Sequence, residues 1–273
     1  MTLSSDISTT STALSDIKTA IIAKGVTPSG NITTYAAAIS NIPSGGGTGI
    51  PREVSQQGVY QMPASSFTFS LPSNATDVGS NGLYYAFYGC TGLTSLDLSS
   101  LTTVSGNYAF YYAFRDCTAL TSVDLSALTT VSGSNGLQGA FYGCTSLTSV
   151  SFPSLATLSG GSAFSYAFSS CTGLTSVSFP SLTTVSGSSA FSYAFSSCTN
   201  IESISFPSLT TSSFGTTYKN QFNYMLVSTG STKTHTLHFP SNLQSTISGL
   251  TGYPNFGGTS GYVTLSFDLP ATS

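Results

Sequence analysis

Five cysteines are the only ones in this 273-residue chain, and each follows the previous one at an interval of 27 residues. The residues around each cysteine repeat as well, as in AFYGCTGLTSLDLSSLTTVSG and AFSSCTGLTSVSFPSLTTVSG. A fixed period with a constant phase predicts a solenoid, in which every repeat forms one coil stacked on its neighbours. The five positions are Cys90, Cys117, Cys144, Cys171 and Cys198.

The apolar spacing changes twice within one coil. Apolar residues between Leu83 and Cys90 recur three or four positions apart, which predicts a short helical arc. Leu96 and Leu98 then flank polar Asp97, as in a strand, and a Ser-Gly pair turns the chain into the next coil. Stacked coils would place equivalent strands about 4.8 Å apart in one parallel sheet. Since no coil can bury its apolar face alone, the ladder needs a cap at each end.

The coil pattern resembles the BspA-like class of leucine-rich repeats. That class has the pattern AF-x-x-C-x-x-L-x-x-[VI]-x-[IFL]-P, which residues 167–180 match at every specified position. The resemblance covers residues from about 65 to 210, although BspA-like units are usually shorter. It implies an α/β repeat fold: a leucine-rich-repeat solenoid with 27-residue coils and a parallel β-sheet, preceded here by a short helical N-terminal module.

The cysteines are interpreted as a ladder of buried, reduced thiols, one small apolar side chain per coil. A disulfide framework is the first alternative, but five is an odd number and regular stacking opposes pairing between equivalent positions. A zinc site is the second alternative, and it would need histidine or carboxylate ligands beside the thiols.

Four regions follow from the repeat and from the turn residues. Residues 1–42 are predicted to be a helical module for attachment or oligomerisation, and residues 43–51 a Gly-rich linker. Residues 52–212 are predicted to form the solenoid with its N-terminal cap. After a break in the period, residues 213–273 are predicted to be a degenerate repeat and the C-terminal cap.

The N-terminal module resembles a short module of phage tail and fibre proteins, through the pattern IKxAI…KGV…Y…I between residues 17 and 42. That resemblance implies that the module joins other virion proteins and forms a homo-oligomer. The N-terminus has neither a basic nor an apolar signal-peptide region, so we expect a virion or extracellular location without a signal peptide.

Charged residues make up only 5% of the chain, and its net charge is −3. Soluble domains usually contain about 25% charged residues, so hydroxyl and amide groups must keep this surface hydrated. The absence of a basic run argues against nucleic-acid partners, and no apolar stretch is long enough for membrane insertion.

Catalytic and metal-binding patterns are weak. Asp97 and Asp124 occupy equivalent positions on adjacent coils and could form a carboxylate pair, but we interpret them as exposed acids. His235 and His238 are three residues apart in a strand-like segment and should lie on opposite faces. No nucleophile elbow, phosphate loop or metalloprotease motif occurs, so we expect no enzyme, no cofactor and no metal.

Tyrosines remain as the candidates for ligand contact. Tyr84 and Tyr88 lie four residues apart opposite Phe87, and Tyr111 and Tyr142 occupy equivalent positions in later coils. Exposed tyrosines among Ser, Thr and Asn suit binding to a host surface glycan or protein. The alternative is that these rings only pack between coils.

Three functions fit these patterns. The first is a virion-surface or tail-fibre protein that binds host structures through the solenoid. The second is a bacterial cell-surface adhesin of the BspA-like type, and the third is a structural spacer that binds nothing.

Overall fold

The structure is a computed structural model that describes residues 66–71, 73–214, 221–222, 224–227, 234–248 and 263–270. The predictions for residues 1–42 and 43–51 lie outside the described residues.

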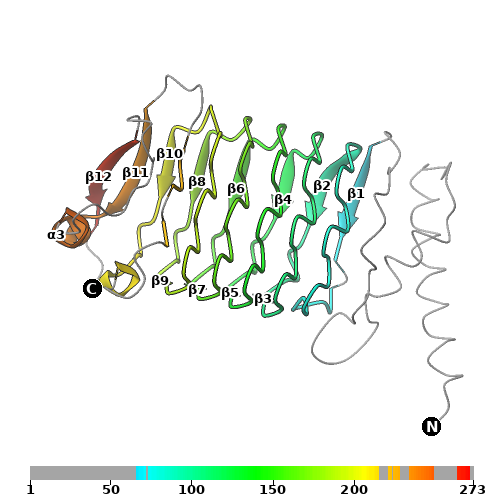
Figure 1. The fold of residues 1–273 in the computed structure, drawn as a ribbon, viewed down its shortest axis with the longest axis horizontal. Helices are drawn as coiled ribbons and strands as arrows, with labels where there is room; N and C mark the ends of the chain where they lie inside the picture. Colours follow the sequence, from blue (N-terminus) through cyan, green and yellow to red (C-terminus); the bar gives the residue numbers. More distant parts are fainter. Residues whose placement is uncertain are drawn as a thin grey trace, which may run out of the picture.

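The described chain is a solenoid built on a parallel sheet of eight strands (Figure 1). Neighbouring strands pair with the register that the period predicts, for example Ser95 opposite Ser122 and Val150 opposite Val177. The predicted parallel-sheet solenoid with 27-residue coils is therefore confirmed. The strands, in sheet order, are β1 (Phe67–Ser70), β2 (Leu93–Asp97), β4 (Ser122–Asp124), β6 (Ser149–Ser151), β8 (Ser176–Ser178), β10 (Ser203–Ser205), β11 (His235–Pro240) and β12 (Val263–Leu269).

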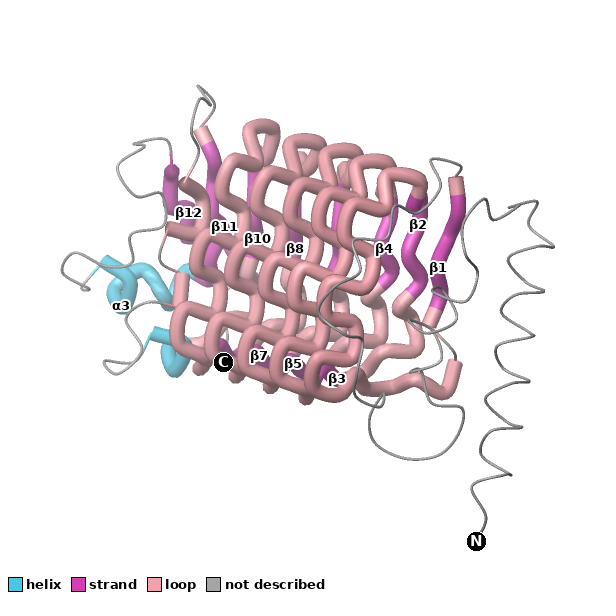
Figure 2. Tube along the Cα trace, turned by 45° about the vertical axis from the view of Figure 1, so that its right-hand side comes forward, coloured by secondary structure: helices cyan, strands magenta, loops and turns pink. Residues whose placement is uncertain are grey.

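A second parallel sheet follows the return segments of the coils. Each of its strands has two residues, a Thr that is partly exposed and a Val or Leu that is buried. Figure 2 shows these short strands along a different edge of the solenoid from the large sheet. The four strands are β3 (Thr103–Val104), β5 (Thr130–Val131), β7 (Thr157–Leu158) and β9 (Thr184–Val185).

The large sheet continues beyond the break in the sequence period. β11 pairs with β10 and β12 pairs with β11, both in parallel. Phe239 stacks on Phe206 with ring centroids 5.5 Å apart, so the core also continues. Short helical elements accompany this C-terminal end: η1 (Thr211–Phe214), η2 (Ser241–Leu243) and α3 (Gln244–Ser248). None of the described helices is long and apolar enough to cross a membrane.

The arc between the two sheets is a run of turns, and not the helical segment that the sequence spacing predicts. The N–H of Ala86 donates to Leu83 O within its own coil (3.1 Å), whereas the N–H of Leu83 donates to Ala109 O of the next coil (2.7 Å). A left-handed residue recurs at every fourth position, as at Asn81 (φ 59°) and Tyr85 (φ 53°). Four-residue turns repeat at nearly the same interval as a helical face, which explains why the apolar spacing predicted a helix.

One phenylalanine per arc builds the centre of the core. Phe87, Phe114, Phe141, Phe168 and Phe195 are all buried, and successive rings are stacked with centroids 5.2–5.6 Å apart. Offset-stacked aromatic pairs contribute about 0.5–1.5 kcal/mol beyond the area that they bury. Each added coil therefore stabilises the fold further, because its phenylalanine ring covers the ring of the previous coil.

The glycine of each Ser-Gly return is required by close backbone contact. A Cβ atom on Gly133 would lie 2.0 Å from Gly106 O, and one on Gly160 would lie 2.2 Å from Gly133 O. Real Cβ atoms are not found at such distances from backbone atoms, so only glycine fits this column.

Gly133→Ala should therefore lower the free energy of unfolding by about 1–3 kcal/mol or more, as overpacking does in a rigid core. Gly161→Ala is the matched control, because the nearest atom to its added Cβ would be Ser188 Oγ at 3.4 Å. The control should be neutral or stabilising by up to about 1 kcal/mol. Urea denaturation followed by circular dichroism measures both variants, and equal stability of the two would refute the close-contact explanation.

Candidate functional site

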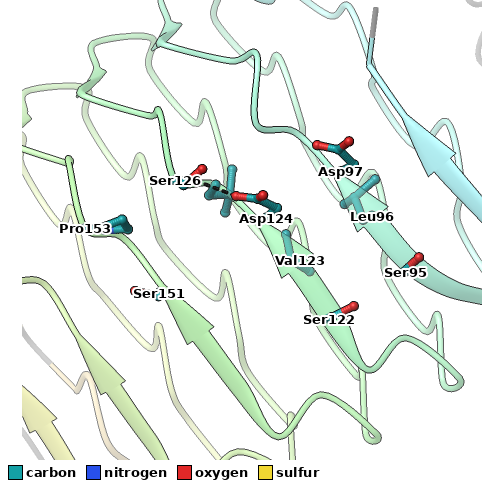
Figure 3. A pocket seen from close by; sticks show the side chains of 10 residues that line it. Ser95, Leu96, Asp97, Ser122, Val123, Asp124, Ser126, Ser151 and Pro153 are labelled. Atoms are coloured by element: carbon teal, nitrogen blue, oxygen red, sulfur yellow. Dashed lines mark hydrogen bonds between the residues drawn. The ribbon is translucent and has the colours of Figure 1, made fainter. Parts of the chain in front are cut away.

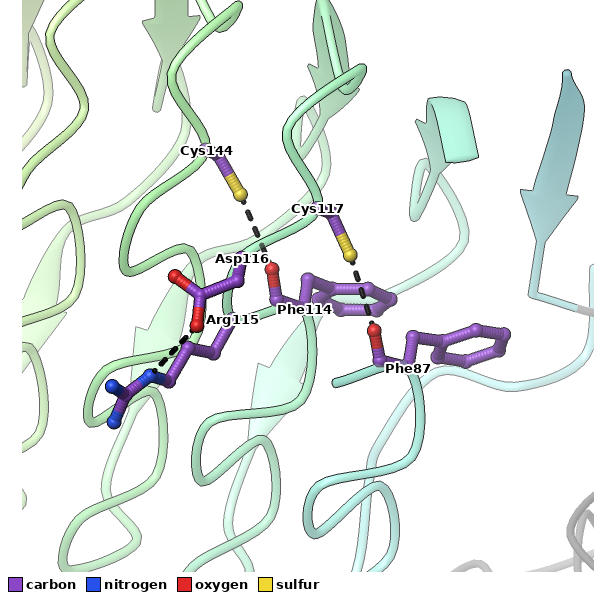
Figure 4. Close-up of polar contacts among 6 residues, drawn as sticks. All are labelled: Phe87, Phe114, Arg115, Asp116, Cys117 and Cys144. Atoms are coloured by element: carbon purple, nitrogen blue, oxygen red, sulfur yellow. Dashed lines mark hydrogen bonds and ion pairs between the residues drawn. The ribbon is translucent and has the colours of Figure 1, made fainter. Parts of the chain in front are cut away.

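The five cysteines lie inside the solenoid as free thiols. Four of them also form a hydrogen bond that the sequence does not reveal, since each thiol donates to a phenylalanine carbonyl of the preceding coil. Cys117 Sγ lies 3.1 Å from Phe87 O, and Cys144 Sγ lies 3.2 Å from Phe114 O (Figure 4). The thiol column therefore links coils as well as filling the core.

The two aspartates lie opposite each other on adjacent strands of the large sheet. Both are exposed, and each accepts a hydrogen bond of 2.9 Å from the backbone N–H two residues later, at Ser99 and Ser126. Hydrogen bonding from Ser99 lowers the pKa of Asp97. A shallow pocket of about 430 Å³ lies between them and Ser151 (Figure 3). Within the described residues no group of three or more potential ligands could hold a metal ion.

The two histidines of β11 lie on different faces. His235 is buried, with Nδ1 2.5 Å from Ile201 O. His238 is partly exposed, and its Nδ1 lies 2.9 Å from Asp268 Oδ1 on β12. The structure therefore does not bring the two imidazoles to one site.

A cluster of tyrosines covers the turn arcs of the first three coils. We call it the tyrosine surface. Tyr84 stacks on Tyr111 with centroids 5.0 Å apart and an interplanar angle of 12°. Tyr111 also meets Tyr108 and Tyr112 edge-to-face, at 5.4 and 4.6 Å. The members of the tyrosine surface are Tyr84, Tyr85, Tyr88, Tyr108, Tyr111, Tyr112, Arg115 and Tyr142.

Arg115 connects the remaining predicted tyrosines. Its guanidinium carbon lies 5.5 Å from the ring centroid of Tyr88, 5.3 Å from that of Tyr112 and 4.6 Å from that of Tyr142. Its Nε atom lies 3.2 Å from Asp116 Oδ2, and about a third of each side chain is exposed. Arg115 is the only arginine or lysine among the described residues.

Four members of this surface are the tyrosines that the sequence predicts as ligand contacts, and the other four are not predicted from the sequence. Tyr84 and Tyr111 are in direct contact, whereas Tyr88 and Tyr142 each pack against Arg115. The repeat indicates that Arg115 belongs to this surface, because it lies 27 residues after Tyr88 and 27 residues before Tyr142.

Three residues of the surface have left-handed backbone, as do Tyr166, Tyr193 and Tyr224 outside it. The φ angles of Tyr85, Tyr108 and Tyr112 are 53°, 56° and 49°. An L-residue in this conformation costs roughly 1–2 kcal/mol, which glycine would avoid. Tyr85 and Tyr108 are also exposed, by 36% and 41%. Their side chains therefore add little to the core at positions where glycine would fit the backbone better.

A second group of tyrosines supports the packing alternative. Tyr166, Tyr193 and Tyr224 form a simple stack, with centroids 4.9 and 5.2 Å apart. No charged side chain of the described residues packs against these rings. This stack resembles the phenylalanine column, but it lies on the outside of the arcs.

Comparison with protein families identifies the repeat. A model of the "BspA type Leucine rich repeat region" matches residues 56–191 and 112–247. The chain belongs to this family. The match does not extend to residues 1–42, so the resemblance of that module to phage proteins stays a hypothesis.

Solved structures similar to this BspA-type solenoid include a leucine-rich repeat protein of T. pallidum. It is 25% identical, with a TM-score of 0.39, and the match covers 76% of this chain and 87% of that one. The pneumococcal vaccine antigen PcpA is 13% identical, with a TM-score of 0.40, over 78% of this chain and 44% of that one. A leucine-rich repeat protein from Bacteroides ovatus is 18% identical, with a TM-score of 0.18, over 70% and 65%. A search of curated proteins gave no match.

The buried thiols should resist labelling in the folded protein. Burial raises the pKa of Cys144 and of Cys198 to about 12, so the reactive thiolate is scarce at pH 8. Mass spectrometry after a short exposure to N-ethylmaleimide should find these cysteines unmodified in buffer and fully modified in 6 M guanidinium chloride. Rapid labelling without denaturant would contradict the buried ladder.

Proposed function

We propose that this protein is a non-enzymatic binding protein that contacts its target through the tyrosine surface. Membership of the BspA-type family supports a solenoid that displays side chains along a rigid ladder. The proposal rests chiefly on the clustering of seven tyrosines with Arg115 on the arcs of the first three coils, where two of the rings are exposed by 36% and 41%.

The chemistry of the surface suits multivalent contact. Tyrosine offers a large contact area with a polar tip and loses little entropy on binding. Because charged residues are scarce, affinity should come from contact area and hydrogen bonds more than from electrostatic attraction. Several copies on one particle or cell would multiply a weak single contact.

Such a protein could be located on a virion or on a bacterial cell surface. The N-terminal sequence pattern favours a virion, where residues 1–42 would join other virion proteins and form a homo-oligomer. The BspA-type ladder is equally compatible with a bacterial cell-surface adhesin. Immunogold labelling of purified virions and of whole bacterial cells distinguishes the two.

A variant with Tyr84, Tyr88, Tyr111 and Tyr142 replaced by Ser tests the binding proposal. Its attachment to a panel of bacterial and mammalian cells should fall at least about tenfold, equivalent to about 1.4 kcal/mol. The control replaces Tyr166 and Tyr193 by Ser, because these rings are also stacked but lie outside the tyrosine surface. Flow cytometry measures attachment, and circular dichroism compares the thermal midpoints.

Attachment of the native protein should change little between about 0.05 M and about 0.5 M NaCl, since few charges can be screened. Undiminished attachment of the four-site variant, or a steep dependence on salt, would refute the proposal.

A further inference from the structure

We propose that Arg115, Asp116 and the three tyrosines around them form a subsite for one neutral sugar of a glycan chain. This inference rests on the proposed function, because it names the ligand class of the same surface. We call these residues the arginine cage: Tyr88, Tyr112, Arg115, Asp116 and Tyr142.

The polar atoms of the cage match the hydroxyl groups of a sugar. Asp116 pairs with the Nε atom of Arg115, and the terminal guanidinium nitrogens form no hydrogen bond among the described residues. The two side chains project together from the arc (Figure 4). Guanidinium N–H groups only donate and a carboxylate only accepts, whereas each sugar hydroxyl can do both. Neighbouring hydroxyls of one sugar ring can therefore bond to both members of the pair.

The tyrosines hold this pair in place before a ligand arrives. Three rings lie within 5.5 Å of the guanidinium carbon, so the side chain of Arg115 has lost much of its rotational freedom. A group fixed in advance pays less entropy on binding. The rings also present the C–H and O–H groups against which the apolar face and the hydroxyls of a sugar can pack.

The charge of the cage selects a neutral ligand. Arg115 and Asp116 cancel each other, and the other acidic groups among the described residues have no lysine or second arginine there to balance them. A carboxylated or phosphorylated ligand would meet the Asp116 carboxylate beside the guanidinium of Arg115. A ligand with a purely apolar contact face would cover both polar groups without hydrogen bonds, which is costly.

Two glycines of the next coil make room for the cage. A Cβ atom on Gly139 would lie 2.2 Å from Cε1 of Tyr112, and one on Gly143 would lie 2.3 Å from Oδ1 of Asp116. Both glycines have left-handed backbone, at φ 60° and 72°. The position of Gly139 is occupied by tyrosine one coil earlier and one coil later, at Tyr112 and Tyr166. The missing side chain therefore lets Tyr112 lean toward Arg115.

The test applies the full-length protein to immobilised neutral hexasaccharides of glucose, mannose, galactose, xylose and N-acetylglucosamine. A galacturonic acid hexasaccharide serves as the acidic comparison. The native protein should bind at least one neutral sugar chain and should bind the acidic chain more weakly. Arg115→Lys keeps the charge but loses the flat, forked guanidinium, and should weaken binding at least about tenfold.

Gly139→Tyr should weaken binding similarly, because the new ring displaces Tyr112 from the cage. Ser189→Tyr is its matched control, since Ser189 has the same left-handed conformation (φ 53°) and lies in the arc three coils after that of Arg115. The control should bind like the native protein, and thermal midpoints show whether each variant is folded. Absence of neutral-sugar binding, stronger binding of the acidic chain, or normal binding by Arg115→Lys would overturn the inference.

Cells treated with periodate, which cleaves vicinal diols, separate this inference from the function on which it rests. Attachment that is lost after periodate supports the sugar subsite. Attachment that survives periodate but is lost after protease treatment, and that still requires the tyrosine surface, refutes the sugar and leaves the binding function intact.

Discussion

Backbone hydrogen bonds between successive coils determine most of this structure. In the arcs, every second N–H donates to a carbonyl one coil further on, as from Phe87 to Ala113 O and from Phe114 to Ala140 O. In the large sheet, parallel pairing has the same effect. Since each coil must present its groups at the same height and phase as its neighbour, side chains with the same place in the repeat form columns. Each side chain must therefore fit against the equivalent side chain of the neighbouring coil as well as within its own coil.

Each column makes a different contact between successive coils. Phenylalanines cover one another's faces, and glycines admit the close approach of one return loop to the next. Another small apolar side chain could not fully replace the cysteines of their column. Phe87 O accepts from both Cys90 N and Cys117 Sγ, at 3.1 Å each, so the thiol completes the hydrogen bonding of a buried carbonyl. Alanine would fill part of the same space without that bond.

The period alone was sufficient to predict the sheet, its register and the buried ladder. It could not predict the conformation of the arc, because Leu83 and Phe87 are four residues apart both on a helix and in a run of four-residue turns. This error also affected the candidate site. A helical arc would point Tyr84 and Tyr85 in directions about 100° apart, whereas the turns place both rings in one cluster, with centroids 4.8 Å apart. Arg115 interrupts the column of Tyr88 and Tyr142, so the pattern of repeated tyrosines does not include it. Only its place in the 27-residue repeat indicates that it belongs to this column.

The last two regular coils show what one position of the arc contains when no such cluster is built. The column of Tyr84 and Tyr111 continues as Ser165 and Ser192, and Ser165 Oγ donates to Ser192 O at 3.0 Å. Serine is thus sufficient for the backbone at this place in the repeat, because it satisfies a neighbouring carbonyl and adds no exposed area. The large aromatic side chains at this place in the first coils therefore exceed what stacking requires. The difference between equivalent positions of one ladder therefore separates side chains that build the solenoid from side chains that the solenoid displays.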